Sequence, residues 1–397
     1  MKLLFLRVSI TLLLFLASLL NFFPVPAHAL WYVGIAVPEF PWIFMIAALF
    51  LLGWNGYERK WRKATTLITA VAFIIFTSPI IRAYTIGVDI NERLVKSFGP
   101  DVNEIKGFHQ DKPFTFLQMF SGHGAKDISF TTYHYAEHSG IDLTLNFYPS
   151  AVPGIRPCLI VVHGGSWRSG DNSEIKAVNN YYANAGYQVA TINYRLAPKF
   201  HSPAPQEDLH AAFTWLRKHA AELNIDTSNF VLTGRSAGAQ IVLTMAYTGN
   251  ENGVKGVAAF YGPTDMFYSY EHPDNPLIMD SREVQRGFLG GAPNEVPDRY
   301  TAESAIMHVT PQTTPTVLIH GEQDAHVWSI QAERLGKTLD DNKVNNLVLL
   351  FPWATHGCEY NLNGPAGQLS LYTVERFFYA VTQNKQASQL APDTQKR

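Results

Sequence analysis

The sequence predicts an α/β domain with a mostly parallel, eight-stranded sheet covered by helices on both faces, preceded by N-terminal membrane segments. Most of the long apolar runs fall within the first 82 residues. After residue 127, short runs rich in β-branched residues alternate with amphipathic stretches, a rhythm typical of a parallel sheet covered by helices. Only 16% of the 397 residues are charged and the net charge is −2, so nucleic acid is not expected as a partner.

The first apolar segment, residues 1–29, begins with Lys2 and Arg7 and continues almost without polar residues to Phe23. It ends in Pro-Ala-His-Ala. A positive start, an apolar centre and an Ala-x-Ala ending are typical of a secretory signal peptide. The same pattern fits an uncleaved first transmembrane helix, and the sequence leaves both interpretations open.

Two further apolar segments cover about residues 31–54 and 64–81. The first is interrupted by prolines, and its clean part is short for a bilayer core, which needs roughly 20 residues. The second carries no charge and is long enough to cross. Aromatic residues flank both segments, as they do at membrane interfaces: Trp31, Tyr32, Trp54, Tyr57 and Trp61.

The basic segment at 58–63 predicts the orientation, because Lys and Arg favour the cytoplasmic side. This segment and the N-terminus are both expected there, and the last apolar run then crosses outward. Everything after residue 82 is therefore predicted to lie on the periplasmic or extracellular side. If the proline-interrupted run does not span, the number of crossings is even and the α/β domain lies inside.

Residues 83–126 show few periodic patterns and are predicted to be a connector, followed by the α/β domain at 127–384 and a polar tail at 385–397. A long connection at about 266–310 is predicted to be a small lid or pocket wall, or to use its aromatic residues for a core of its own. Helices are predicted near residues 172–185, 205–223, 237–247, 329–339 and 367–381. Strands are predicted near residues 128–136, 141–148, 158–162, 187–194, 230–233, 254–261, 316–320 and 347–351, the first two as an antiparallel hairpin.

The two cysteines, Cys158 and Cys358, are predicted to be free and buried. Their separation does not match any metal-binding spacing. Cys158 begins its strand and Cys358 follows the last strand, so they fall at opposite ends of the sheet. A disulfide needs Cα atoms within roughly 7 Å, which this arrangement does not allow.

Residues 234–238, Gly-Arg-Ser-Ala-Gly, lie between a predicted buried strand and a predicted helix. In that context Gly-x-Ser-x-Gly forms a sharp turn that lifts the serine oxygen clear of the backbone. The flanking glycines leave room for the neighbouring strand and helix. Ser236 is therefore the predicted nucleophile.

The loop that begins with His163-Gly164-Gly165 directly follows another predicted strand. Acyl transfer places negative charge on a carbonyl oxygen, which backbone N–H groups must already face. Adjacent glycines allow the chain to turn its amides inward. The N–H groups of Gly164, Gly165 and Ala237 are therefore predicted to form an oxyanion hole.

A serine nucleophile needs a base and the base needs an orienting acid, in the chain order Ser, acid, His for this kind of sheet. Asp324 and His356 both follow predicted strands at the carboxyl edge, and they are the predicted acid and base. Alternatives are Glu322 and Asp265 for the acid and His326 for the base. Asp265 comes too early in this chain order, and His326 is only two residues from Asp324, the acid that should orient it.

Two other charged residues near these motifs are predicted to have structural roles. Asp208 precedes the serine turn on a helix start, and pairing with Arg195 is favoured over catalysis. Arg235, beside the serine, is expected to be packed or salt-bridged, although a contact with a substrate carboxylate is the alternative.

Together these residues resemble the α/β-hydrolase superfamily, specifically the hormone-sensitive-lipase-like and feruloyl-esterase-like (BD-FAE-type) carboxylesterases. The resemblance covers about residues 127–382, and the membrane segments lie outside it. One departure is Ser166, where lipase-like members often have a third glycine, which bears on the oxyanion hole and acyl pocket. Further matching motifs are Trp-Arg-Ser-Gly-Asp at 167–171, Tyr-Arg-Leu-Ala-Pro at 194–198, Pro-Ala-Pro-Gln-Glu-Asp at 203–208 and Tyr-Gly-Pro-Thr-Asp at 261–265.

The resemblance implies hydrolysis of a small-molecule carboxylic ester, with a short acyl group or a carbohydrate-linked ester, and without a cofactor or metal. A formamidase-like amide hydrolase shares the same motifs. A prenylcysteine methylesterase-like enzyme also joins membrane segments to this domain. The alternative from another class is a catalytically silent, membrane-tethered binding protein, which an intact triad and oxyanion hole argue against.

Overall fold

The computed structural model describes residues 2–54, 59–249 and 251–382. A single sheet of eight strands runs in the order β1-β2-β4-β3-β5-β6-β7-β8. β1 and β2 form the predicted hairpin, β2 is also antiparallel to β4, and all other pairs are parallel. The strands are β1 (Thr131–His138), β2 (Ile141–Tyr148), β3 (Arg156–Val162), β4 (Gln188–Ile192), β5 (Ile225–Arg235), β6 (Val254–Phe260), β7 (Thr316–Gly321) and β8 (Asn346–Phe351).

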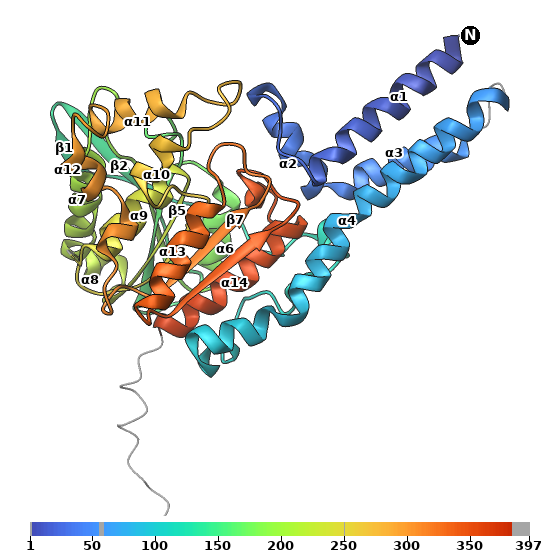
Figure 1. Ribbon diagram of the computed structural model, residues 1–397. Coiled ribbons are helices and arrows are strands. Elements are labelled where there is room, and N and C mark those ends of the chain that lie inside the picture. The colour runs from blue at the N-terminus through green and yellow to red at the C-terminus, as the bar shows by residue number, and fades with distance from the viewer. Residues whose placement is uncertain (1, 55–58, 250, 383–397) are drawn as a thin grey trace, which may run out of the picture.

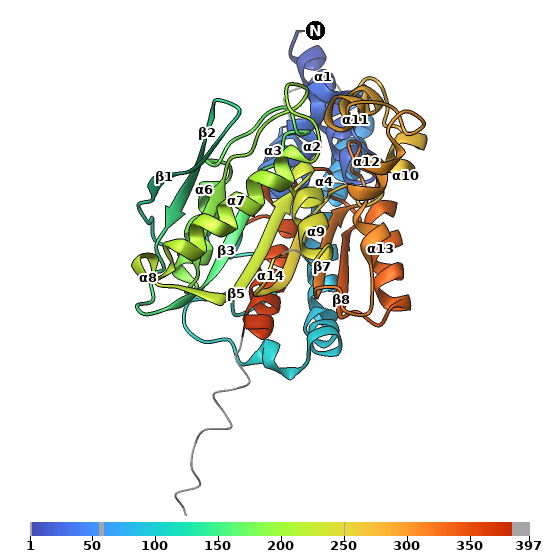
Figure 2. The same cartoon turned by 90° about the vertical axis from the view of Figure 1, so that its left-hand side faces the viewer.

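Helices cover both faces of the sheet, as predicted (Figures 1 and 2). One face packs against α7 (Ala204–Lys218), α8 (Ala220–Leu223), α9 (Ala237–Tyr247) and α13 (Ile330–Asp341). The other packs against α6 (Lys176–Asn184), α14 (Pro365–Thr382) and the C-terminal half of α4 (Arg59–Phe98). Alternate strand residues point to opposite faces, so each face contributes its own buried cluster. Cys158 and Cys358 are free and buried, as predicted.

The insertion at 266–310 forms a small helical layer over the carboxyl edge of the sheet. It contains α10 (Met266–Glu271), α11 (Ser281–Leu289), α12 (Pro297–Ala302) and the short η4 (Ala305–His308). Part of its aromatic content packs internally, since Phe267 and Tyr270 both contact Tyr300. Phe288 instead stacks on Trp167, with ring centroids 4.5 Å apart, and so joins the insertion to the loop after β3.

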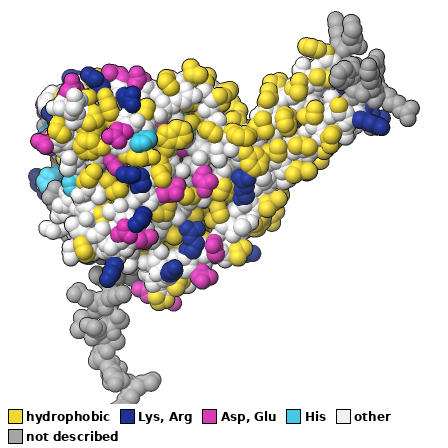
Figure 3. Space-filling model, in the orientation of Figure 1, with side chains coloured by type: hydrophobic (Ala, Val, Ile, Leu, Met, Phe, Trp, Pro, Cys, Tyr) yellow, Lys and Arg dark blue, Asp and Glu magenta, His cyan; other side chains and the backbone are white. Residues whose placement is uncertain are grey.

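The N-terminal region forms a helical arm that projects from the α/β domain (Figure 1). In chain order it contains α1 (Lys2–Ser18), η1 (Leu19–Asn21), η2 (His28–Leu30), α2 (Trp31–Glu39), α3 (Pro41–Gly53) and the first half of α4. Its visible surface is largely hydrophobic (Figure 3). Exposed apolar side chains include Phe5, Leu13, Ile46, Phe50, Leu67 and Ile74. By length and composition, one described helix, within 62–98, could cross a membrane, or two segments could if the bent pair 28–53 counts as one.

The structure divides one predicted apolar segment into two helices and leaves the predicted tail outside the described residues. The apolar segment 31–54 is not one element, because the chain bends by 82° between α2 and α3. Pro41 lacks an N–H and occupies the first position of α3, where a new helix can start but an old one cannot continue. The predicted tail at 385–397, together with Tyr57 and Glu58, lies outside the described residues.

The predicted connector is also wrong in its first part. α4 continues without a break to Phe98, and Ile90 and Leu94 are fully buried against the sheet. Phe98 packs on Phe377 of α14, and the Arg93 guanidinium donates to the carbonyl oxygen of Val348 at 2.7 Å. The charges in this stretch concealed an amphipathic helix with one apolar stripe. The α/β domain therefore includes residues upstream of 127.

Candidate active site

Ser236 occupies the turn between β5 and α9, with φ 53° and ψ −119°. A positive φ is rare for a residue other than glycine and is held only when the surrounding structure enforces it. Here the Ser236 N–H donates to the carbonyl oxygen of Phe260 at 2.9 Å. Ser236 is partly exposed, whereas both its chain neighbours are buried. The turn therefore presents this one side chain.

The two glycines of the motif are required by close packing. A Cβ atom on Gly234 would lie 2.2 Å from the carbonyl oxygen of Gly238, and one on Gly238 would lie 2.2 Å from that of Val162. Both collisions are with backbone, which cannot move aside. These contacts explain why the sequence around Ser236 has glycine on both sides.

His356 and Asp324 come together from the loops after β8 and β7. The His356 Nδ1 lies 2.7 Å from Asp324 Oδ2. The other carboxylate oxygen accepts the backbone N–H groups of His326 and Val327. Burial opposes ionisation of Asp324, but the charge of His356 and hydrogen bonds from the side chains of His320 and His356 outweigh it and lower the pKa of Asp324 overall.

A further partner of Asp324 was missed by sequence reasoning. His320 Nε2 lies 3.2 Å from Asp324 Oδ2 and 2.8 Å from the carbonyl oxygen of Val327. Because both neighbours are acceptors, this nitrogen carries a proton. His320 ends β7 in the motif His-Gly-Glu-Gln-Asp, where its spacing of four residues from Asp324 was the only signal.

Neither alternative acid has the buried, histidine-bound position of Asp324. Asp265 caps α10 by accepting the N–H of Tyr268, and it pairs with Arg334 at 2.8 Å. Glu322 is exposed, next to the buried Asp324 loop. The alternative base, His326, does lie close to the site, with its ring centroid 5.0 Å from that of His356.

The loop after β3 lines the same cavity as Ser236, but the three predicted oxyanion donors are not equivalent. The N–H of Gly164 donates to Glu174 Oε2 at 3.0 Å, so this amide is already engaged. Within the described part of the chain, the N–H groups of Gly165, Ser166 and Ala237 have no hydrogen-bond acceptor. Ser166 has φ 54° and its hydroxyl contacts Met279 Sδ at 3.5 Å. A serine thus replaces glycine there at a left-handed position, and its N–H is a donor that sequence reasoning missed.

Because Gly165 is a predicted oxyanion donor, we expect Gly165→Ala to reduce the rate of the predicted ester hydrolysis by about 10²-fold, the usual loss when such a donor is displaced. At φ 106°, its added Cβ would lie 2.1 Å from the carbonyl oxygen of Ser169. Gly154→Ala is the matched control, with φ 96° and no atom within 4 Å of the added Cβ. Steady-state kcat of the two variants checks this. Equal losses would mean that left-handed strain, rather than displacement of the amide, explains the effect.

Ser236, His356, Gly164 and Gly165 all line one cavity of about 530 Å³, with Asp324 directly behind His356. The insertion contributes Ile278, Met279 and Val284. The N-terminal region contributes His28 and Trp31, which no sequence pattern had assigned to the site. The remaining lining residues are Ser166, Arg168, Ser169, Gly170, Glu174, Arg235, Tyr261, His326 and Tyr360.

Arg235 lies beneath this cavity in a buried ion pair. Its Nε donates to Glu359 Oε1 at 2.6 Å, and both side chains are 2% exposed. Tyr261 donates its hydroxyl to the same oxygen at 2.7 Å. The predicted packed, salt-bridged role of Arg235 is confirmed.

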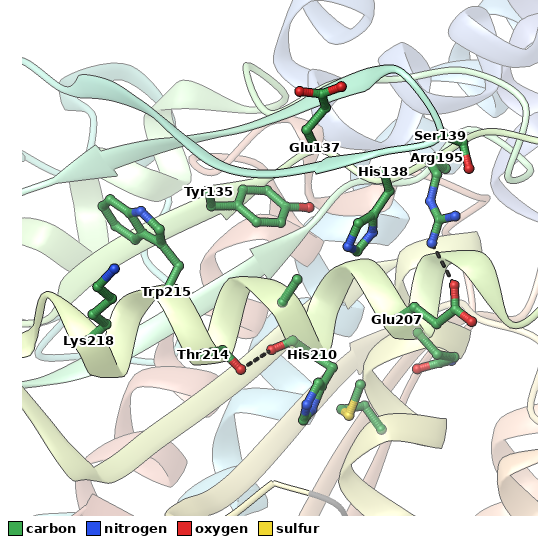
Figure 4. Close-up of a pocket in the computed structure, with 13 residues that line it drawn as sticks. Tyr135, Glu137, His138, Ser139, Arg195, Glu207, His210, Thr214, Trp215 and Lys218 are labelled. Atoms are coloured by element: carbon green, nitrogen blue, oxygen red, sulfur yellow. Dashed lines mark hydrogen bonds and ion pairs between the residues drawn. The ribbon is translucent and has the colours of Figure 1, made fainter.

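A larger, open groove of about 1180 Å³ lies between β1 and α7, away from Ser236 (Figure 4). The charged groups at its floor pair with one another. Arg195 contacts the fully buried Asp208 at 2.8 Å, and His138 Nδ1 lies 2.8 Å from the same carboxylate. The predicted Asp208–Arg195 pair is confirmed. It holds the loop in which Tyr194 stacks on His163, with ring centroids 4.3 Å apart.

His326 should make the protein less stable as the pH falls. Burial, followed by the nearby charge of His356, lowers the pKa of His326 to about 4. In the unfolded chain a histidine titrates near 6.5. Between about pH 6.5 and pH 4 the unfolded state binds a proton that the folded state does not, so stability is lost as the pH drops through this window.

His326→Gln should therefore reduce the difference in stability between pH 7 and pH 5 by roughly 1–2 kcal/mol. Thermal unfolding of the purified full-length protein at the two pH values measures this. Replacing the exposed His134 with glutamine is the control. An unchanged pH dependence in the His326 variant would contradict the assignment.

A serine on a strained strand–helix turn, a His–Asp pair at the same sheet edge and a glycine loop with unused backbone amides lining the same cavity are the features of an α/β-hydrolase. Comparison with known proteins shows which α/β-hydrolases this chain is similar to. The BD-FAE family matches residues 145–339. Esterase LipQ of Mycobacterium tuberculosis is 27% identical over 206 residues, which cover 49% of this chain and 48% of LipQ. The probable carboxylic ester hydrolase LipM of the same organism is 23% identical over 332 residues, covering 76% of this chain and 75% of LipM.

The chain thus spans about half the length of LipQ and three quarters of LipM. The LipM match is longer than residues 127–397, so it must include residues upstream of 127. Among solved structures, carboxyl esterase 2 from the fungus Tuber melanosporum shares the fold, with a TM-score of 0.56 and 19% identity over 66% of this chain and 90% of that one. Together these likenesses support an α/β-hydrolase carboxylesterase of the hormone-sensitive-lipase-like and BD-FAE type.

Proposed function

We propose that this protein is a membrane-tethered serine esterase that hydrolyses small-molecule carboxylic esters through Ser236, His356 and Asp324. One observation carries the proposal: Ser236 and His356 line the same cavity, and the His356 Nδ1 lies 2.7 Å from Asp324. With Nδ1 bound to the carboxylate, Nε2 is the free nitrogen. This nitrogen can accept the proton of the serine hydroxyl.

The reaction follows from these positions. Ser236 Oγ attacks the ester carbonyl carbon while His356 Nε2 takes its proton, and Asp324 stabilises the resulting imidazolium. The N–H groups of Gly165 and Ala237 bind the oxyanion, with Ser166 as the third donor in place of Gly164. His356 then protonates the departing alcohol. Water, deprotonated by His356, then attacks the acyl-enzyme; as the bond from the acyl carbon to Ser236 Oγ breaks, His356 returns the proton to Oγ, and the acid and free Ser236 are released.

The site favours an ester with a short acyl group or a carbohydrate-linked ester, because the cavity of about 530 Å³ combines Ile278 and Met279 with the polar Arg168 and Glu174. The full-length protein should be assayed against acetyl esters, N-formylkynurenine and prenylcysteine methyl esters. Fastest turnover of acetyl esters is expected. Preference for either of the other substrates would favour the amide-hydrolase or methylesterase alternative.

We propose that α1, α3 and the first half of α4 tether the enzyme to a membrane, with the α/β domain on the extracytoplasmic side. Two features support this. Apolar side chains are exposed along the arm, and the start of α1, the end of α3 and the start of α4 lie together at its far end (Figure 1). The basic residues 59–63 lie at that end, which the positive-inside rule assigns to the cytoplasm. A reporter enzyme that works only outside the cytoplasm should be active when it is fused after residue 397. Activity of a reporter that works only in the cytoplasm would contradict the proposed orientation.

A further inference from the structure

We propose that residues 25–39 are a permanent wall of the active site, and that Trp31 is a positioning residue which holds the loop carrying His356. The proposal rests on the proposed function of that site. It also requires that residues 1–29 remain in the mature protein instead of being removed as a signal peptide.

Trp31 is hydrogen-bonded to the backbone of His356, the candidate base. Its indole Nε1 donates to the backbone carbonyl oxygen of His356 at 2.8 Å. The indole ring contacts His28, with centroids 5.7 Å apart, and His326, with centroids 5.1 Å apart, and these two histidine rings also contact each other, with centroids 5.6 Å apart. His326 in turn contacts the His356 ring. A continuous group of rings therefore runs from the N-terminal region to the base, and His28 and Trp31 both line the cavity.

The rest of α2 packs along the same loop. A Cβ atom on Gly34 would lie 3.6 Å from Thr355 Cγ2, and one on Gly357 would lie 3.1 Å from Ile35 Cδ1. The helix therefore lies close against the residues on both sides of His356, with little room for a further side chain between them. Such contact limits the conformations open to the loop.

The C-terminal end of α2 is fixed by the buried carboxylate of Glu39. It accepts the N–H of Ala366 at 3.0 Å and lies 3.3 Å from the Trp353 indole nitrogen. The Asn361 side chain donates to the Glu39 carbonyl oxygen at 2.7 Å. Trp353 and Asn361 lie on either side of His356 in the chain. Because these hydrogen bonds are buried, leaving their groups unpaired would be costly.

The segment before α2 contacts the other two parts of the site. The His28 N–H donates to the carbonyl oxygen of Leu277 in the insertion at 3.0 Å. Val25, 3% exposed, packs with Ile278 and with Ala325, the residue after Asp324. Residues 25–39 therefore join the insertion, the acid loop and the base loop.

Side chains between residues 7 and 24 pack against α4 and the loop before it, so this segment is a structural element of the protein. Thr11 and Thr69 are buried, with their hydroxyl oxygens 3.4 Å apart, and Arg7 donates to the carbonyl oxygen of Trp54. Arg82 donates to the carbonyl oxygen of Asn21 at 3.4 Å. Cleavage after Ala29 would remove α1 from α4, together with Val25 and His28 from the site. We therefore infer that the signal-like pattern is an uncleaved helix.

The test uses the full-length protein with a C-terminal tag. Trp31→Phe removes the N–H donor but keeps an aromatic ring. Its kcat on p-nitrophenyl acetate should fall by about 10-fold or more, with KM changed less than about 3-fold, because a misplaced base slows chemistry without weakening binding of a small ester. Trp42→Phe, the same change in a residue that packs on Phe120 outside the cavity, should leave kcat unchanged.

Intact mass of the purified protein should include residues 1–29, and the melting temperatures of the two variants should agree. A mature chain that begins at Leu30 and is active would overturn the proposal. So would equal kcat in the two variants, or a Trp31→Phe loss fully explained by unfolding. If the unmodified protein hydrolyses no ester at all, the proposed function fails instead, so the two failures are distinguishable.

Discussion

Ser236→Ala should abolish ester hydrolysis, with a fall in kcat of about 10⁴-fold or more. Alanine keeps the turn but removes the only atom that can form the acyl-enzyme. The side chain is small and partly exposed, so folding should be little affected. Turnover of p-nitrophenyl acetate by the purified full-length protein measures the loss. The substrate should still bind, because the cavity lining is otherwise unchanged.

Ser169→Ala is a suitable control for this substitution. Ser169 lines the same cavity, and its hydroxyl donates to the carbonyl oxygen of Gly165 at 3.2 Å. Removing the Ser169 hydroxyl should lower kcat far less than removing the Ser236 hydroxyl. Full turnover in the Ser236 variant, with loss only in the Ser169 variant, would mean that the nucleophile has been assigned to the wrong residue.

Asp324→Asn should lower kcat by about 10⁴-fold while the protein stays folded. The carboxylate accepts the Nδ1 proton of His356, which leaves Nε2 free to act as the base. An asparagine amide can donate to Nδ1 instead, and this favours the tautomer with a proton on Nε2, which cannot accept one from Ser236. His356→Ala should cause a loss of similar size, and the double variant should be little worse than either single one.

Asp265→Asn is the matched control for Asp324, because Asp265 also follows a strand and was an alternative acid. Its partners are Arg334 and the N-terminus of α10. The same isosteric change there should affect stability more than kcat. A large loss of kcat from Asp265→Asn and none from Asp324→Asn would reverse the assignment.

Much of the α/β domain could be predicted because its signals are local. Most of the strands, such as β3, β4, β6 and β7, are short runs of largely buried residues, and glycine or polar residues mark where they end. The turn at Ser236 was recognisable because collisions with backbone permit only glycine at 234 and 238. Once the strand order was assumed, the carboxyl edge brought Asp324 and His356 together.

Other features depend on contacts between distant segments, which periodicity does not report. Gly164 looked equivalent to Gly165, but Glu174 from ten residues on takes its N–H. The stripe of α4 that covers the sheet was hidden among charged residues. The hydrogen bond from Trp31 to His356 joins residues 325 positions apart. In the sequence, Trp31 resembled only an interfacial aromatic residue.

The central claim is that Ser236 is the activated nucleophile of a Ser–His–Asp site, and covalent labelling tests it most directly. The full-length protein should be treated with a fluorophosphonate probe, digested and examined by peptide mass spectrometry. We expect one phosphonylated residue, Ser236, and loss of labelling in the His356→Ala variant, since the serine depends on its base for activation. An adduct on another serine, or none on a folded protein, would contradict the claim.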